Sequence, residues 1–374
     1  MTNTAAPRHP VIYVLHSSQL YGTERMALAT ARGLADEFET IFIGPPGDGL
    51  VEAQRLGFET RQYITSMDLA KVLAPLLKRY RSLTFVGTGP RYNLVCIALN
   101  LWYRRKIRQI QIVHGGSGVE KDYQRKKVLN HFDITFIVVS EWSKQKLVAH
   151  GVRNRIEVIG NFIIPDDLRA FPTRPVYNQP GYRRAIVVSR IDKLKRVELL
   201  LDALDLRPEL SGISFRIFGV GPEIEPLRQR AAKSHPNVDF AGFTADVAGE
   251  MAQADLLVHT CPVETFGLAV LEAMAAKLAV LVPDAGGTAM LVRDGENGFA
   301  FRADDAANLA ERLVELKSAP AELLNRMVSN ALGKVHGEFS AESALSRSDA
   351  DPLPNERLSN CASSSFSNCS PPIP

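Results

Sequence analysis

The chain has 374 residues, which is long for one hydrophobic core and suits two domains. Hydrophobic residues make up 45% and charged residues 23%, as in ordinary globular proteins, and a net charge of +3 is too small to indicate a nucleic-acid-binding protein. Because no signal peptide and no apolar run of about 18 residues can be read, we expect a cytoplasmic protein, either soluble or peripheral on the inner face of a membrane.

Short β-branched runs alternate with helical patterns through the first half of the chain. We expect helices over residues 23–34 and in "SKQKLVAHGV", and strands in "VIYVLH", "TIFIG", "LTFVGTG", "IRQIQIVHGG", "ITFIVVS" and "RIEVIGN". Such a βαβ series predicts a parallel sheet with helices on both faces. Residues 1–172 are therefore assigned to a first Rossmann-like domain.

The second half repeats this rhythm after a break. Prolines and a glycine without periodicity in "FPTRPVYNQPGYRR" predict a linker over residues 173–181. Strands are then expected in "AIVVSR", "SFRIFGVG", "VDFAGF", "ADLLVHT", "LAVLVP" and "GFAF", with helices between them and after the last. Residues 182–340 thus form a second Rossmann-like domain, and the predicted fold class is α/β, with two doubly wound domains facing a cleft. Residues 341–374 are rich in Ser and Pro, and we expect a disordered tail there.

Charge is unevenly distributed between the two halves. Residues 1–170 hold 23 Lys and Arg against 15 Asp and Glu, whereas residues 171–374 hold 21 against 26. A basic first half could face an acidic acceptor or an anionic lipid surface, and an ordinary solvated surface explains it equally well. In "LWYRRKIRQ" (101–109), aromatic residues adjoin four cations; we favour a helix end that leads into a strand over a peripheral membrane contact.

Two carboxylates frame the segment "CPVETFGLAVLEAM" (261–274). A helix is expected to start near 265–267, because Pro262 bars an earlier start, and its first turn would offer unpaired N–H groups to a phosphate. Glu264 would then precede this helix and Glu272 lie in its second turn, on the order of 10 Å away. A sugar nucleotide suits this layout, with its diphosphate on the amides of Phe266, Gly267 and Leu268. The alternative to a ligand site is that Glu264 is an acid near the helix start and Glu272 a solvated helix residue. The spacing alone supports both interpretations about equally.

The segment "HTCPVETFGLAVLEAMAAKLAVLVPDAGGTAMLVRDGENGFAF" resembles the signature region of the family 4 glycosyltransferases, which are retaining enzymes of the GT-B fold. Their pattern is a Glu, seven residues, a second Glu, then Ala-Met-Ala and a later Gly-Gly. The resemblance covers roughly residues 10–340. It implies that Glu264 contacts the donor sugar and that Glu272 holds the ribose.

Other positions match this family more loosely. "VSRIDKLKR" resembles its Gly-Arg-Leu…Lys-Gly segment, which makes Arg190 and Lys195 the expected cations on the donor diphosphate, although Ser189 and Arg196 replace two glycines. The resemblance also implies donor-side roles for other residues, where an ordinary turn or a structural His is the alternative. They are Gly22 in the loop after the first strand, His114, Gly219 of "FGVGPE", and Phe243 and Thr244 of "AGFT" near the base. By contrast, Glu24 and Arg25 are expected to open a helix rather than to act chemically.

The resemblance implies transfer of a hexosyl group from a nucleotide sugar to a glycan, lipid-linked or small-molecule acceptor by a same-face displacement. No cofactor is expected, and no metal, because the four cysteines show no ligand spacing and the only Asp-x-Asp, Asp349 to Asp351, lies in the tail. Two other functions stay open: a sugar-nucleotide-binding protein with little or no transferase activity, and a GT-B-fold epimerase. A dehydrogenase is disfavoured because the first loop lacks Gly-x-Gly-x-x-Gly.

Overall fold

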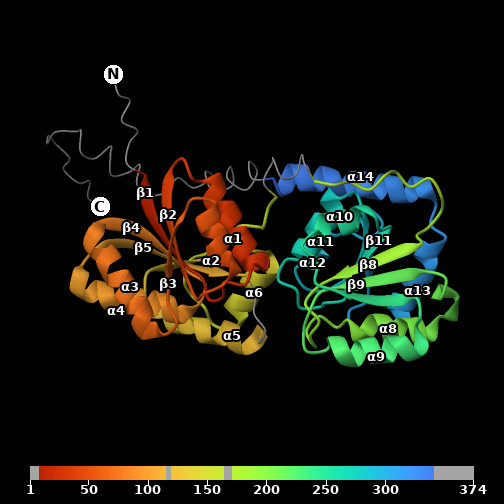
Figure 1. Ribbon diagram of the computed structural model, residues 1–374, viewed down its shortest axis with the longest axis horizontal. Coiled ribbons are helices and arrows are strands. Elements are labelled where there is room, and N and C mark those ends of the chain that lie inside the picture. The colour runs from red at the N-terminus through yellow and green to blue at the C-terminus, as the bar shows by residue number, and fades with distance from the viewer. Residues whose placement is uncertain (1–7, 115–118, 164–170, 341–374) are drawn as a thin grey trace, which may run out of the picture.

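Two α/β lobes lie side by side in the computed structural model, which describes residues 8–114, 119–163 and 171–340 (Figure 1). Each lobe is built on one parallel sheet. The first sheet has the strand order β3-β2-β1-β4-β5-β6-β7, and the second has the order β10-β9-β8-β11-β12-β13. The predicted fold class, two doubly wound Rossmann-like domains, is therefore confirmed.

The elements of the first lobe alternate strictly along the described chain. Its strands are β1 (His9–Val14), β2 (Phe38–Gly44), β3 (Glu59–Gln62), β4 (Ser82–Gly87), β5 (Lys106–Val113), β6 (Ile134–Val138) and β7 (Ile156–Val158). Its helices are α1 (Gly22–Gly33), α2 (Asp48–Arg55), α3 (Ser66–Arg79), α4 (Pro90–Tyr103), α5 (Val119–Lys126), the 3-10 turn η1 (Lys127–His131) and α6 (Glu141–Ala149). The edge strand β3, with the polar sequence ETRQ, is one that the hydrophobic pattern did not predict.

In the second lobe strands and helices alternate as far as β13, after which two helices follow in succession. Its strands are β8 (Arg184–Val188), β9 (Ser214–Phe218), β10 (Val238–Gly242), β11 (Leu256–Val258), β12 (Ala279–Pro283) and β13 (Phe299–Phe301). Its helices are α8 (Glu198–Leu206), the 3-10 turn η2 (Pro208–Leu210), α9 (Ile224–Ser234), α10 (Val247–Ala252), α11 (Leu268–Ala275), α12 (Thr288–Leu291), α13 (Ala306–Lys317) and α14 (Ala321–Glu338).

Successive strand residues pack on opposite faces of each sheet, which is why the strands read as continuous apolar runs. On β1, Ile12 and Val14 belong to a core with α3 and α4, whereas Tyr13 belongs to a core with α1 and α2. On β8, Ala185 and Ile186 divide in the same way between the two cores of the second lobe. Parallel sheets are buried on both faces, so most strand positions are apolar, with Gln109 and Gln111 on β5 as buried polar exceptions.

Both sheets reverse their strand order at an internal pair, which fixes where a ligand can bind. In the second lobe the reversal lies between β8 and β11, and in the first between β1 and β4. Loops that leave the carboxyl ends of such strands diverge to opposite faces, and ligands of open α/β sheets bind there. The segments that follow β1, β8 and β11 contain Gly22, then Arg190 and Lys195, then Glu264. Strand order thus gathers predicted site residues at the carboxyl edges of the sheets.

The end of α14 joins the second lobe back to the first. The amide of Ile163 donates to the carbonyl of Phe339 at 3.0 Å, and Ile163 also forms a β-bridge with Ser340. The ring of Phe339 meets Phe266 edge-on, with ring centroids 5.6 Å apart. Figure 1 shows α14 running along one side of the second lobe toward the first. The tail predicted over residues 341–374 lies outside the described residues.

Residues 173–181 contain neither helix nor strand and pack on the second lobe. Arg174 pairs with Asp255 at 2.9 Å, and the hydroxyl of the buried Tyr177 donates to the carbonyl of Asp255 at 2.6 Å. Within the described residues, no helix has both the length and the apolar character needed to cross a membrane.

Candidate active site where the two lobes meet

Helix α11 begins at Leu268 because Gly267 turns the chain just before it. Gly267 has a φ of 98°, in the left-handed region that favours glycine, and the helical bonds start where Val270 and Leu271 both donate to the Gly267 carbonyl. A β-carbon at Gly267 would lie 2.5 Å from Cγ2 of Thr288. The amides before Val270 belong to the first turn, which has no helical acceptors. The predicted helix start at 265–267 is therefore correct to within a few residues.

Glu264 and Lys195 form an ion pair beside this helix start. Burial raises the pKa of Glu264, but the charge of Lys195 and the hydrogen bonds from Lys195 and Thr265 more than offset it, so the net shift is downward. Burial lowers the pKa of Lys195, and Glu264 more than reverses that effect. Both groups are therefore charged at neutral pH. The structure thus brings together two of the residues predicted to hold the donor.

The loop after β8 positions Lys195 through Asp192. One carboxylate oxygen of Asp192 accepts from the amides of Leu194 and Lys195, at 3.0 and 3.2 Å. The other oxygen pairs with Arg190, whose side chain is 46% exposed. The hydroxyl of Thr260 donates to the Lys195 carbonyl at 2.7 Å, so the loops after β8 and β11 are tied together. Arg190 lies in the predicted loop. Its ion pair is with Asp192, which was not among the predicted site residues.

His259 and Cys261 lie behind the Lys195–Glu264 pair and were not singled out by the sequence. Nε2 of His259 is buried, lies 3.7 Å from the Glu264 carboxylate, and has no hydrogen-bond partner within the described residues. Burial lowers the pKa of His259 to about 4 and raises that of the Cys261 thiol to about 11. At neutral pH the imidazole is thus uncharged and the thiol protonated. The sequence gave no signal for these two residues, because their burial and their closeness to Glu264 depend on the path of the loop after β11.

Glu272 is buried on α11, and its partner comes from the other lobe. Arg25 of α1 pairs with it at 2.8 Å, with side-chain exposures of 53% for Arg25 and 11% for Glu272. Burial raises the pKa of Glu272, and Arg25 offsets only part of that rise. Arg25 lies in the first turn of α1 as expected, and its ion pair with Glu272 is a contact that the sequence did not predict. A local pattern could not reveal this contact, because α1 and α11 are about 250 residues apart in sequence.

Three further contacts join the lobes around the start of α11. The hydroxyl of Thr265 donates to the carbonyl of His114 at 2.6 Å, and that of Ser140 donates to the carbonyl of Thr265 at 2.6 Å. A β-carbon at Gly22 would lie 2.7 Å from Cδ1 of Leu268, so the glycine permits α1 and α11 to approach closely. The predicted residues Gly22, His114 and Leu268 thus lie at one junction. The two lobes touch directly at this junction.

Residues 173–333 match the model of the family "Glycosyl transferases group 1". This part of the chain, which covers most of the second lobe, therefore resembles the group 1 glycosyltransferases. The chain is 25% identical over 255 residues to an uncharacterized glycosyltransferase of Methanocaldococcus jannaschii, covering 66% of this chain and 67% of that one. It is 32% identical over 180 residues to a phosphatidyl-myo-inositol mannosyltransferase of Mycobacterium leprae, covering 47% of this chain and 46% of the relative. The latter match thus spans less than half of the relative's length.

The fold is the GT-B fold of two solved glycosyltransferase structures. The crystal structure of HepE from Anabaena in complex with UDP-glucose superposes with a TM-score of 0.77 at 20% identity, over 94% of this chain and 99% of that one. TarM from S. aureus superposes with a TM-score of 0.74 at 13% identity, over 91% and 98% of the two chains. At these sequence identities the structural similarity supports a shared fold and nothing further.

The remaining predicted site residues lie at the ends of β9 and β10. A β-carbon at Gly219 would fall 1.8 Å from the carbonyl oxygen of Ser189, and the Gly219 amide donates to the Gly242 carbonyl, so the loops after β8, β9 and β10 adjoin. Phe243 is 72% exposed, and the hydroxyl of Thr244 accepts from the amide of Asp246. Both lie at the carboxyl edge of the sheet, without contact to the Lys195–Glu264 pair. Their role near the base stays a prediction.

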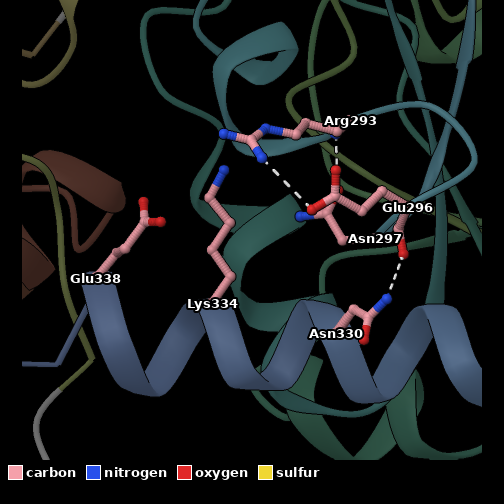
Figure 2. Close-up of a pocket in the computed structure, with 6 residues that line it drawn as sticks. All are labelled: Arg293, Glu296, Asn297, Asn330, Lys334 and Glu338. Atoms are coloured by element: carbon pink, nitrogen blue, oxygen red, sulfur yellow. Dashed lines mark hydrogen bonds and ion pairs between the residues drawn. The ribbon is translucent and has the colours of Figure 1, made fainter.

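A small pocket beside α14 does not belong to this site. Its volume is about 100 Å³, and Figure 2 shows that Asn330, Lys334 and Glu338 of α14 face Arg293, Glu296 and Asn297 across it. It contains none of the predicted residues, and known small-molecule sites are typically 300–1,000 Å³. The pocket is too small for a sugar nucleotide.

The segment 101–109 is the end of α4 followed by the start of β5, as we favoured from the sequence. Arg104 ends the helix with a φ of 52°. Leu101 and Trp102 are 77% and 87% exposed beside it. Contact of this segment with a membrane stays a prediction.

Proposed function

We propose that the chain transfers a hexosyl group from a nucleotide-diphosphate sugar to an acceptor hydroxyl, with retention at the anomeric carbon. The observation that carries this proposal is the Lys195–Glu264 pair beside the amide end of α11. The site thus combines a cation, backbone amides and a carboxylate that can accept hydrogen bonds from hydroxyls. It lies at the carboxyl edge of a doubly wound sheet, where such sheets bind ligands.

In the proposed donor complex, each part of the donor has its own partner. The diphosphate rests on Lys195 and the amides of residues 266–268, the sugar hydroxyls bind Glu264, and the ribose hydroxyls bind Glu272. Because Arg25 holds Glu272 in the free protein, donor binding replaces one partner of a buried carboxylate by another. The UDP-glucose complex of HepE makes a UDP-sugar the first donor to test.

The proposed reaction is a same-face displacement. Negative charge grows on the departing diphosphate, where Lys195, Arg190 and the amide end of α11 stabilise it. The departing phosphate oxygen takes the proton of the acceptor hydroxyl while the glycosidic bond forms. Because Glu264 is engaged by Lys195, we do not propose that it attacks the sugar as the nucleophile of a retaining glycosidase does.

His114 is proposed to contact the donor sugar as a neutral imidazole. Burial, together with the nearby His16, lowers its pKa to about 4. Its Nε2 is buried without a hydrogen-bond partner within the described residues, so it has capacity to bond a sugar hydroxyl.

We propose that the reaction needs neither a metal ion nor a cofactor. Lys195 and Arg190 supply two positive charges in one loop, and the first turn of α11 supplies amides, which is the role that a divalent ion takes in other transferases. The acceptor is a glycan, a lipid-linked sugar or a small molecule, bound from the side of the first lobe.

A donor screen followed by product analysis tests the proposal. Thermal-shift measurements with UDP-, GDP- and ADP-sugars should identify one donor that raises the melting temperature. Incubation of that donor with an acceptor panel in the presence of EDTA should then give a product whose anomeric configuration, read by NMR, matches that of the donor.

Other outcomes of the same screen would refute specific parts of the proposal. An inverted product would exclude same-face displacement, and activity that disappears with EDTA and returns with Mg²⁺ would exclude metal independence. Donor binding without transfer to any acceptor would favour a sugar-nucleotide-binding protein, and conversion of the donor to its epimer would favour an epimerase.

A further inference from the structure

Three metal-ligand side chains converge behind the proposed donor site. His259, Cys261 and Glu264 follow β11 within six residues, and an imidazole nitrogen, the thiol sulfur and a carboxylate oxygen all lie within 4.8 Å of one another. His259 is 4% and Cys261 2% exposed. Nε2 of His259 is buried and lacks a hydrogen-bond partner within the described residues. A buried ring nitrogen without a partner is costly, and a metal ion is one group that satisfies it.

This cluster already holds a cation, because the Lys195 ammonium is bound to Glu264. A divalent ion that binds the thiolate of Cys261 carries a net charge of +1, the same as the ammonium it would replace. The exchange therefore leaves the charge beside Glu264 unchanged, which avoids the cost of burying an extra charge. The Lys195 side chain is 23% exposed, so its ammonium can withdraw toward solvent.

We propose that His259, Cys261 and Glu264 form a binding site for a borderline-soft divalent ion of the Zn²⁺ class. Nitrogen, sulfur and carboxylate oxygen are the ligands that Zn²⁺ takes, with a water completing four-coordination. On binding, the Cys261 S–H bond breaks, its proton passes to solvent, and the sulfur–metal bond forms. Mg²⁺ is excluded, because it requires oxygen ligands in octahedral geometry.

Occupancy of this site inhibits sugar transfer, a consequence that rests on the proposed function. The ion takes Glu264, the group proposed to hold the donor sugar, and releases Lys195 from its position beside the diphosphate. Zn²⁺ and the donor therefore compete. Zn²⁺ is expected to raise the apparent KM for the donor and to leave kcat at saturating donor unchanged.

The binding step is tested by equilibrium dialysis of the full chain against Zn²⁺. Cys361→Ser and Cys369→Ser are introduced first, so that Cys96 and Cys261 are the only thiols left. One Zn²⁺ per chain is expected. Cys261→Ser and His259→Gln should each weaken binding at least tenfold, whereas the matched control Cys96→Ser should leave it unchanged, and Mg²⁺ should not compete.

Several results overturn the inference. They are an absence of Zn²⁺ binding by a chain that circular dichroism shows to be folded, or equal Zn²⁺ affinity in the parent, Cys261→Ser and His259→Gln chains. Because dialysis needs no activity, a chain that binds Zn²⁺ but transfers no sugar upholds the metal site and refutes the proposed function. An active chain that binds no Zn²⁺ refutes the metal site alone. Inhibition by Zn²⁺ that persists in Cys261→Ser refutes the assigned ligands.

Discussion

Glu24 is a carboxyl group with almost no solvent contact and is 1% exposed in the first turn of α1. Burial raises its pKa from 4.5 to about 7, although hydrogen bonds from two backbone amides partly offset this rise. One of its oxygens has no hydrogen-bond partner within the described residues. The unfolded chain releases this proton first, so folding stability falls as the pH rises from about 4.5 to about 7.

Glu24→Gln should remove that pH dependence. Relative to the wild type, the variant is expected to gain about 2 kcal/mol in free energy of unfolding between pH 5 and pH 8, because it has no carboxylate to bury. Chemical denaturation at several pH values measures the difference. The same substitution at the exposed Glu37 controls for loss of a carboxylate on this lobe. A constant difference between variant and wild type across this range would show that Glu24 is already ionised in the fold.

Lys195 and Lys193 lie in one loop and differ in their surroundings. Lys195 is half-buried and paired with Glu264, whereas Lys193 is exposed. Lys195→Ala should lower kcat/KM for the donor at least tenfold, because the diphosphate loses a cation and Glu264 is left buried without its partner. Lys193→Ala is the matched control and should stay within twofold of the wild type. Steady-state kinetics that show equal losses for both variants would contradict the donor pose.

At the scale of one element, α11 depends on the glycine that starts it. Gly267→Ala is expected to destabilise the fold by about 1–2 kcal/mol, since its φ of 98° strains any other residue and the new methyl would meet Thr288. Gly333→Ala within α14 is the control, because a methyl there would meet nothing within 4 Å, and it should stabilise the fold by about 0.5–1 kcal/mol. Thermal unfolding measures both changes. Equal and small effects would mean that the turn before α11 tolerates a side chain.

At the scale of the whole molecule, the two lobes meet where the donor is proposed to bind. Arg25 holds Glu272 across the junction, and Thr265 bonds to His114. A donor placed at the start of α11 must therefore part these contacts. We expect binding to include an opening of the lobes, with the free protein held closed by a few polar contacts that together contribute only a few kcal/mol.

Arg25→Ala should tighten donor binding about fivefold, because the guanidinium competes with the ribose for Glu272. That factor corresponds to about 1 kcal/mol, the contribution of an ion pair with one exposed partner. Glu272→Ala should have the opposite effect and weaken donor binding at least tenfold. Isothermal titration with the donor from the screen measures both variants, and Arg25→Lys, which keeps the charge, should stay near the wild type. Weaker binding in Arg25→Ala would mean that Arg25 itself contacts the donor.

The amino-acid sequence by itself determined the parts of this protein that depend on local pattern. Alternation of apolar runs and helical stretches predicted the strands of both sheets except β3, because a buried parallel strand must be apolar on both faces and an edge strand need not be. The motif around Glu264 and Glu272 located the helix start and the pair of carboxylates. Proline and glycine positions were informative for the same reason, since they act on the backbone locally.

Only the tertiary structure decided which groups these residues meet. The contact of Glu272 with Arg25 depends on how the lobes dock, and that of Glu264 with Lys195 depends on strand order. The cluster of His259, Cys261 and Glu264 depends on the path of the loop after β11. The sequence shows that a side chain is charged or polar, but it does not show whether that side chain is solvated or buried. The ion-pair partner and the pKa of each group depend on how deeply it is buried. Burial in turn depends on segments that are distant in the sequence.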